Sequence, residues 1–122
     1  TILAYNCLGE MYQDIIPVVT ETTEPVSTVL IINPLEFRYM TQQEIVNYIS
    51  KACQHLLSPG RLIININLFT IVYDRLNISL NTYCNTLVQS IENLGFKLID
   101  ESKRLDNLTH GYGHWFLSFD YV

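Results

Sequence analysis

Apolar residues repeat at helical spacing between positions 41 and 57. The members of this stripe are Ile45, Val46, Ile49, Ala52, Cys53, Leu56 and Leu57. Thr41 precedes the stripe and Glu44 lies three residues further on, the spacing of a capping box, in which each side chain satisfies a free backbone N–H. We expect Ser58-Pro59-Gly60 to end the helix, because proline cannot continue the hydrogen-bond ladder. The pattern predicts a helix over about 41–57.

Two β-branched apolar runs, residues 28–33 and 61–68, lie on either side of this helix. Both are bounded by turn-forming residues, which is typical of strands. The first run is apolar on both faces, as in a parallel strand covered by helices. Strand, helix and strand with short connections form a βαβ unit, whose crossover is right-handed. We therefore expect the two strands to be parallel neighbours.

The last third of the chain predicts a helix over 80–94 followed by two strands, 96–104 and 114–122. The apolar positions of the helix are Leu80, Cys84, Leu87, Val88, Ile91 and Leu94, with Gly95 as its stop. No helix-length segment separates the two strands. They are therefore expected to be antiparallel at one edge of the sheet, joined by a loop over 105–113.

The N-terminal pattern is weaker. Residues 2–6 favour a strand. The apolar positions that follow, Leu8, Met11, Tyr12, Ile15 and Ile16, favour a short amphipathic helix that stops at Pro17.

Composition restricts the class of protein. The 122 residues are 48% hydrophobic and only 16% charged, which predicts a packed globule, here a single domain over 1–122. The net charge of −5 and the scattered Lys and Arg disfavour nucleic acid as a partner. Three cysteines without close spacing favour a reducing, cytoplasmic location. No apolar run approaches the roughly 20 residues needed to span a bilayer. The chain begins at Thr1, so we interpret it as processed or as a piece of something longer.

The residues at the joints between these elements carry a family resemblance. They read Ile32-Asn33-Pro34-Leu35-Glu36-Phe37, then Leu57-Ser58-Pro59-Gly60-Arg61, and later Leu94-Gly95-Phe96. In this order they resemble the C-terminal half of class I S-adenosylmethionine-dependent methyltransferases, over about residues 26–122. The resemblance implies an α/β, partial Rossmann-like sheet, with two parallel strands and an antiparallel C-terminal hairpin flanked by helices.

The glycine-rich loop that holds the cofactor in this family has no counterpart in the sequence. None of the five glycines forms a G-x-G-x-x-G or acidic-x-G-x-G string. By the resemblance, S-adenosylmethionine would bind only with a missing segment and not to the isolated chain. Two functions stay open: part of a methyltransferase whose cofactor loop lies outside this chain, or a degenerate, non-catalytic module acting through protein contacts. An unrelated small α/β ligand-binding domain is a third.

The turn after the strand at 28–33 supplies most of the candidate site residues. Open α/β sheets bind ligands at the carboxyl ends of their parallel strands, where Asn33 and Pro34 lie. The resemblance places Asn33, Pro34 and Leu35 beside the methyl donor. It also gives Asn33 a role toward a target amine and Phe37 one in substrate contact. Glu36 is a candidate general base or amine anchor. The plainer alternatives are a turn for Asn33-Pro34 and a solvated carboxylate for Glu36.

Two further places hold candidate substrate contacts. Asn67 lies near the carboxyl end of the strand at 61–68, where its amide either lines a cleft or makes internal hydrogen bonds. His110 and Tyr112 belong to the loop His110-Gly111-Tyr112-Gly113-His114, which holds two of the three histidines. Because no third or fourth ligand lies nearby in sequence, we predict no metal site there.

The run Val29–Ile32 also predicts a partner. It has no lysine, proline or bulge to protect a free edge, so something must pair with it. The candidates are the segment Ile2–Asn6, a second copy of the chain, or a different protein chain. We rank a second chain slightly ahead, since Ile2–Asn6 is short and Asn6 and Gly9 favour a turn.

Overall fold

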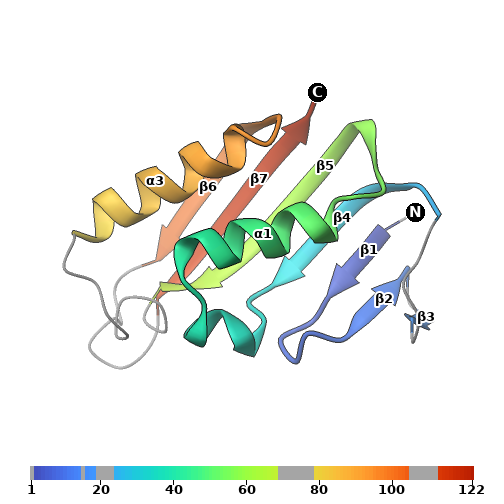
Figure 1. Ribbon diagram of the computed structural model, residues 1–122, viewed down its shortest axis with the longest axis horizontal. Helices are drawn as coiled ribbons and strands as arrows, with labels where there is room; N and C mark the ends of the chain where they lie inside the picture. The colour runs from blue at the N-terminus through green and yellow to red at the C-terminus, as the bar shows by residue number, and fades with distance from the viewer. Residues whose placement is uncertain (1, 15, 19–23, 69–78, 105–112) are drawn as a thin grey trace.

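The computed structural model describes residues 2–14, 16–18, 24–68, 79–104 and 113–122, which form a two-layer α/β fold (Figure 1). Seven strands build one sheet in the order β3-β2-β1-β4-β5-β7-β6. The strands are β1 (Ile2–Tyr5), β2 (Met11–Gln13), β3 (Ile16–Val18), β4 (Val26–Ile32), β5 (Leu56–Asn67), β6 (Phe96–Arg104) and β7 (His114–Tyr121). The helices are α1 (Gln42–Ala52), α3 (Leu80–Glu92) and the short 3₁₀ helix η1 (Leu35–Tyr39).

The predicted βαβ unit is β4–α1–β5. The two strands are parallel neighbours, with Val29 opposite Leu62, as predicted. Helix α1 begins at the expected capping box: the Thr41 side chain accepts from the Glu44 N–H, and the Glu44 side chain accepts from the Thr41 N–H. These reciprocal bonds satisfy two of the N–H groups left free at the start of the helix.

The predicted end of this helix is wrong. Helix α1 ends at Ala52, and Ser58-Pro59-Gly60 lies inside β5 rather than after the helix. Leu56 is buried and pairs with Val26, so the strand begins earlier than the proline suggested. Pairing with β4 and burial of Leu56 therefore override the helical spacing of Leu56 and Leu57.

The C-terminal prediction is confirmed for the helix and the two strands, whereas the expected loop over 105–113 lies, apart from Gly113, outside the described residues. Helix α3 ends just before Gly95, whose φ of 106° is in the region that favours glycine. Strands β6 and β7 are antiparallel, and β7 lies between β6 and β5, antiparallel to both. The chain from β4 onward thus has the expected fold: α/β and Rossmann-like, with parallel strands and an antiparallel C-terminal hairpin.

The N-terminal segment agrees only in part. The expected strand is present as β1, parallel to β4. The expected helix over residues 8–16 is wrong, because Met11–Gln13 and Ile16–Val18 are the antiparallel strands β2 and β3. The reason is a tight turn: the Asn6 side-chain oxygen accepts from the Leu8 and Glu10 N–H groups and reverses the chain. Met11 is thereby brought opposite Tyr5.

Strand β1 also takes the place where we expected another chain. Strand β4 pairs with β1 on one side and with β5 on the other, so neither of its edges is open to a second chain. A segment of only four residues suffices, because it pairs in register with the apolar run from Thr28 to Ile31.

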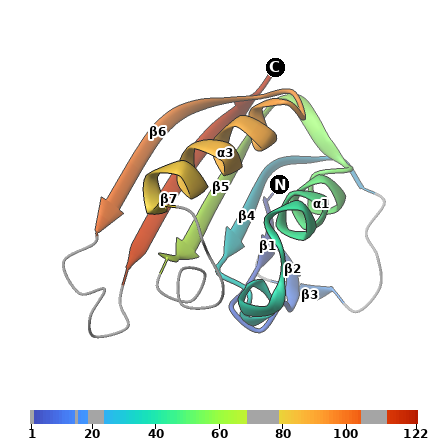
Figure 2. The same cartoon turned by 60° about the vertical axis from the view of Figure 1, so that its left-hand side comes forward.

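The two faces of the sheet differ. Helices α1 and α3 lie on the same face, and no helix of the described residues covers the other (Figures 1 and 2). On β5, Leu62, Ile64 and Ile66 are fully buried beneath the helices, while the alternate residues Ile63 and Asn65 point to the uncovered face. No helix in the described residues is long and apolar enough to cross a membrane.

Candidate functional site

The carboxyl ends of the parallel strands β1, β4 and β5 meet at one edge of the sheet, and most of the predicted site residues lie there. Asn33 follows β4 with a φ of 33°, a left-handed conformation that asparagine tolerates. Its N–H donates to the Asn65 carbonyl (2.8 Å), and its side-chain oxygen accepts from the Asn67 N–H (3.1 Å). The structure therefore brings Asn33 and Asn67 together and uses the Asn33 side chain to bind β5 to the end of β4.

The turn after Asn33 is hydrogen-bonded to the loop after β1. The Leu35 N–H donates to the Cys7 carbonyl at 2.8 Å. Pro34 is buried, whereas Leu35 is exposed. Phe37, a candidate for substrate contact, is 1% exposed and packs edge-on against Tyr48, with ring centroids 5.3 Å apart. Phe37 is thus a core residue that anchors η1, and its ring does not face solvent.

The Glu36 carboxylate lies over Gly9, between the β1 loop and helix α1. A Cβ atom at Gly9 would lie 2.9 Å from Glu36 Oε1, and the φ of Gly9 is +78°. Glycine is favoured here by its backbone conformation, whereas the flexible, exposed Glu36 side chain could move to make room for a Cβ. The hydroxyl of Tyr48 is buried and has no hydrogen-bond partner among the described residues. Burial raises the pKa of Tyr48 well above its usual range, and the charge of Glu36 raises it further.

The loop after β1 is closed on itself. The Asn6 N–H donates to the Glu10 carbonyl (3.0 Å), and the Gly9 N–H donates to the Asn6 carbonyl (2.9 Å). The Asn6 side-chain oxygen accepts from Leu8 N–H (3.0 Å) and Glu10 N–H (2.9 Å), and its amide donates to Glu10 Oε1 (3.0 Å). Four backbone N–H groups of the loop are thus paired within the loop. A loop that holds a ligand presents such groups to the ligand instead.

Sequence reasoning missed the cluster of Glu36, Gly9 and Tyr48. Its members are far apart in the chain and belong to different elements, so no local spacing connects them. The Asn6-to-Gly9 turn did carry a signal, since asparagine and glycine are common turn residues. That signal indicated a turn but did not show what the turn would lie against.

The remaining candidates are separate from this cluster. His110 and Tyr112 lie outside the described residues. His114 is opposite Asn67 in the β5–β7 pairing, on the face without helices. Within the described ranges, no group of three or more His, Cys, Asp or Glu side chains is arranged to hold a metal ion.

Comparison with known proteins gives structural neighbours only. No protein-family model and no curated protein sequence matches the chain. The fibrillarin pre-rRNA processing protein of Methanococcus jannaschii is 15% identical with a TM-score of 0.59, over 87% of this chain and 45% of that one. The N-methyltransferase NodS of Bradyrhizobium japonicum WM9 is 8% identical with a TM-score of 0.59, over 84% of this chain and 55% of that one.

A third neighbour is a variant of the 16S rRNA (adenine(1408)-N(1))-methyltransferase of Catenulisporales acidiphilia. It is 17% identical with a TM-score of 0.57, over 80% of this chain and 50% of that one. The described residues share a partial Rossmann-like fold with these methyltransferase structures. The chain spans about half the length of these solved structures.

Proposed function

We propose that this chain is a non-catalytic, methyltransferase-type module that acts through protein–protein contacts and does not bind S-adenosylmethionine. The proposal concerns activity and cofactor, whereas the methyltransferase-like fold stands independently of it.

The observation that carries the proposal is the closed loop after β1. Strand β1 occupies the position beside β4 that the resemblance gives to the strand bearing the cofactor loop. In this chain the loop is closed by Asn6, and the Glu36 carboxylate covers Gly9. A cofactor at this position would have to displace hydrogen bonds that the loop already makes.

The next strand supports the same conclusion. In a dinucleotide-type site, an acidic residue at the end of a parallel second strand binds the ribose. Here β2 turns back antiparallel to β1 directly after the loop. Its three residues, Met11 to Gln13, include no acid.

An alternative function keeps the cofactor. In it, the chain is part of an S-adenosylmethionine-dependent methyltransferase whose cofactor loop is supplied from outside this chain. Two observations favour it: the chain spans only about half of its neighbours, and several of those neighbours are solved with S-adenosylmethionine or S-adenosylhomocysteine. Against it, a supplied strand could not pair with β4, because β1 already does.

Calorimetric titration of the 122-residue chain with S-adenosylmethionine, and separately with S-adenosylhomocysteine, tests the proposal. We expect no saturable binding up to about millimolar concentration, which corresponds to a binding free energy weaker than about −4 kcal/mol. The NodS methyltransferase, whose complex with S-adenosylhomocysteine is solved, serves as the positive control. Binding of either compound at micromolar concentration would overturn the proposal.

A matched variant makes the test sharper. Glu36→Ala removes the carboxylate over Gly9 and leaves the hydrogen bonds of Asn6 in place. We expect this variant to remain unable to bind. If it gains micromolar affinity, a cofactor site is retained beneath Glu36, and the proposal of a module without such a site is wrong.

A further inference from the structure

The face of the sheet opposite the helices presents a group of apolar side chains. We call this surface the open face and define its apolar centre by five residues: Ile2, Leu30, Ile32, Ile63 and Phe116. The first three come from β1 and β4, and the others from β5 and β7. Three of them are large and exposed: Ile2 by 44%, Ile32 by 40% and Phe116 by 47%.

The strand register places these residues on one face: Leu30 is opposite Ile63, and Asn65 lies between Ile32 and Phe116. Sheets built from parallel strands normally have both faces covered, and helices are the elements that cover them. A group of exposed apolar side chains on one face, interrupted here by Asn65, is a candidate interaction site.

The net charge of the residues on the open face is positive, whereas the net charge of the whole chain is negative. Three basic residues point to this face: Arg61 on β5, and Lys97 and Arg104 on β6. The acidic residues on it are Asp100 and Asp120, which register with Ser118 and Arg61. Among the residues that the structure describes, three of the six Lys and Arg but only two of the nine Asp and Glu therefore lie on the strands of this face, although the net charge of the chain is −5.

This distribution of charge favours an acidic partner over a second copy of the chain as the molecule that binds the open face. Arg61 and Asp120 pair with each other at 3.4 Å, which leaves Lys97 and Arg104 against Asp100. A second copy docked face to face would set one positive surface against another. An acidic partner would instead be attracted, because complementary charge steers association and excludes wrong partners.

We propose that the open face binds an amphipathic α-helix of a partner protein, with apolar residues along one side and acidic residues flanking them. The apolar stripe packs on Ile32, Ile63 and Phe116, and the acidic flanks face Lys97 and Arg104. This inference rests on the proposed function as a binding module and names its surface and its class of partner.

The probe is a designed helical peptide of about 18 residues, long enough to form a helix on binding. It carries leucines at i, i+3, i+4 and i+7 spacing and glutamates on both flanks. Its control has lysines in place of every glutamate. We expect saturable, salt-sensitive binding of the glutamate peptide to the 122-residue chain by fluorescence anisotropy, and at least about tenfold weaker binding of the lysine peptide.

Two protein variants locate the site. Phe116→Ser should weaken binding of the glutamate peptide at least about tenfold, because it removes the largest apolar side chain of the patch. Ile16→Ser is the control: Ile16 is 67% exposed, but it registers with Gln13 and thus with Leu3, on the helix-covered side. It should bind like the parent chain. Cooperative urea unfolding of both variants shows that they are folded.

Several outcomes overturn the inference: no saturable binding of the glutamate peptide, equal binding of the lysine peptide, or unchanged binding by Phe116→Ser. A chain that light scattering shows to be a dimer, and that Phe116→Ser makes monomeric, would assign the face to a second copy instead. None of these results changes the cofactor titration. Failure here with no cofactor binding therefore refutes only this surface, whereas cofactor binding refutes the proposed function itself.

Discussion

Adjacent residues of strand β7 lie on opposite faces of the sheet and differ strongly in burial. Trp115, Leu117 and Phe119 are at most 1% exposed and lie beneath the helices. Phe116, between the first two of them, is 47% exposed on the other face. Because side chains alternate along a strand, each row has its own role. One row builds the core, and the other lies on the face without helices.

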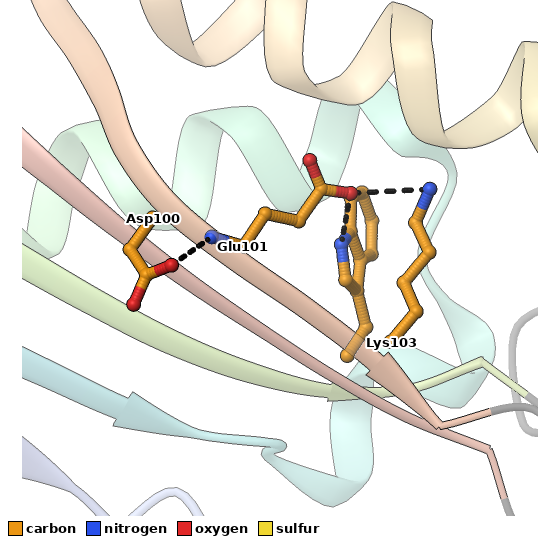
Figure 3. A network of polar contacts seen from close by, with 4 residues as sticks. Asp100, Glu101 and Lys103 are labelled. Atoms are coloured by element: carbon orange, nitrogen blue, oxygen red, sulfur yellow. Dashed lines mark hydrogen bonds and ion pairs between the residues drawn. The ribbon is translucent and has the colours of Figure 1, made fainter.

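The faces also differ in how their polar groups are satisfied. On the covered face, the indole N–H of Trp115 donates to Glu101 Oε1 (2.9 Å), and Lys103 Nζ lies 3.1 Å from the same oxygen (Figure 3). The Lys103 ammonium is also 5.4 Å from the centre of the Trp115 ring. On the open face, the side-chain nitrogen of Asn65 is buried without a hydrogen-bond partner among the described residues. The covered side also has one such atom, the Tyr48 hydroxyl of α1, so the Trp115–Glu101–Lys103 network, and not complete pairing, distinguishes the covered face.

The largest expected effect comes from truncating the same residue type on the two faces. Phe119→Ala should lower the free energy of unfolding by about 3–5 kcal/mol, because it leaves a cavity in the core. Phe116→Ala should lower it by less than about 1 kcal/mol, since much of its ring is already in water. Urea unfolding at 25 °C measures both. Similar losses for the two variants would show that the open face is packed like the core, and the comparison would fail.

A smaller effect tests the polar contact at Trp115. Trp115→Phe keeps most of the apolar volume but removes the N–H that Glu101 accepts. We expect a loss of about 1–2 kcal/mol, below the full value of a charged hydrogen bond, because Glu101 and Lys103 are partly exposed. Glu101→Gln is the control, since it retains an oxygen acceptor and should cost less. If Glu101→Gln costs more than Trp115→Phe, the ion pair with Lys103 outweighs the indole bond.

The covered face was largely predictable from the sequence because its signals are local. The apolar stripes of α1 and α3 and the runs of β4 and β5 repeat at the spacing of their own elements. The capping box of Thr41 and Glu44 lies within four residues. The end of α1 was missed because the pairing of Leu56 with Val26 connects residues far apart in the chain. Such pairing competes with local propensity and is not visible in it.

The candidate site was predictable in place but not in arrangement. The carboxyl ends of β4 and β5 carry the separately predicted candidates Asn33 and Asn67, and the hydrogen bond that joins them is visible only in the structure. The burial of Phe37 and the position of Glu36 over Gly9 depend on how η1 packs against α1 and the β1 loop. Strands β2 and β3 have three residues each, too few for a period to distinguish them from a helix.

The helix layer that covers one face of the sheet depends in part on the hydrogen bonds at its helix caps. Thr41→Ala removes the oxygen that accepts from the Glu44 N–H, and we expect a loss of about 1 kcal/mol. Thr41→Ser keeps that oxygen and should stay within about 0.5 kcal/mol of the parent chain. Both are measured by urea unfolding. Equal losses for Ala and Ser would mean that the methyl group of Thr41, and not its hydrogen bond, is what matters.

The smallest effect at neutral pH, and a distinct one at alkaline pH, is expected from the thiols. Burial raises the pKa of Cys53 to about 12, and burial also raises the pKa of Cys84, on the covered side. The folded state therefore holds these thiol protons more tightly than the unfolded chain, in which the thiol pKa is about 8.5. Stability from this source is fully present below about pH 8.5 and is lost as the pH rises toward 12. Urea unfolding should give the same free energy at pH 7 and 8, then a decline above about pH 9 that is shallower in Cys53→Ala.

A thiol reagent at pH 8 should modify exposed Cys7 rapidly, and Cys53 and Cys84 only on unfolding. Rapid modification of all three in the folded chain would show that the helix-covered side is no better protected than the exposed loop.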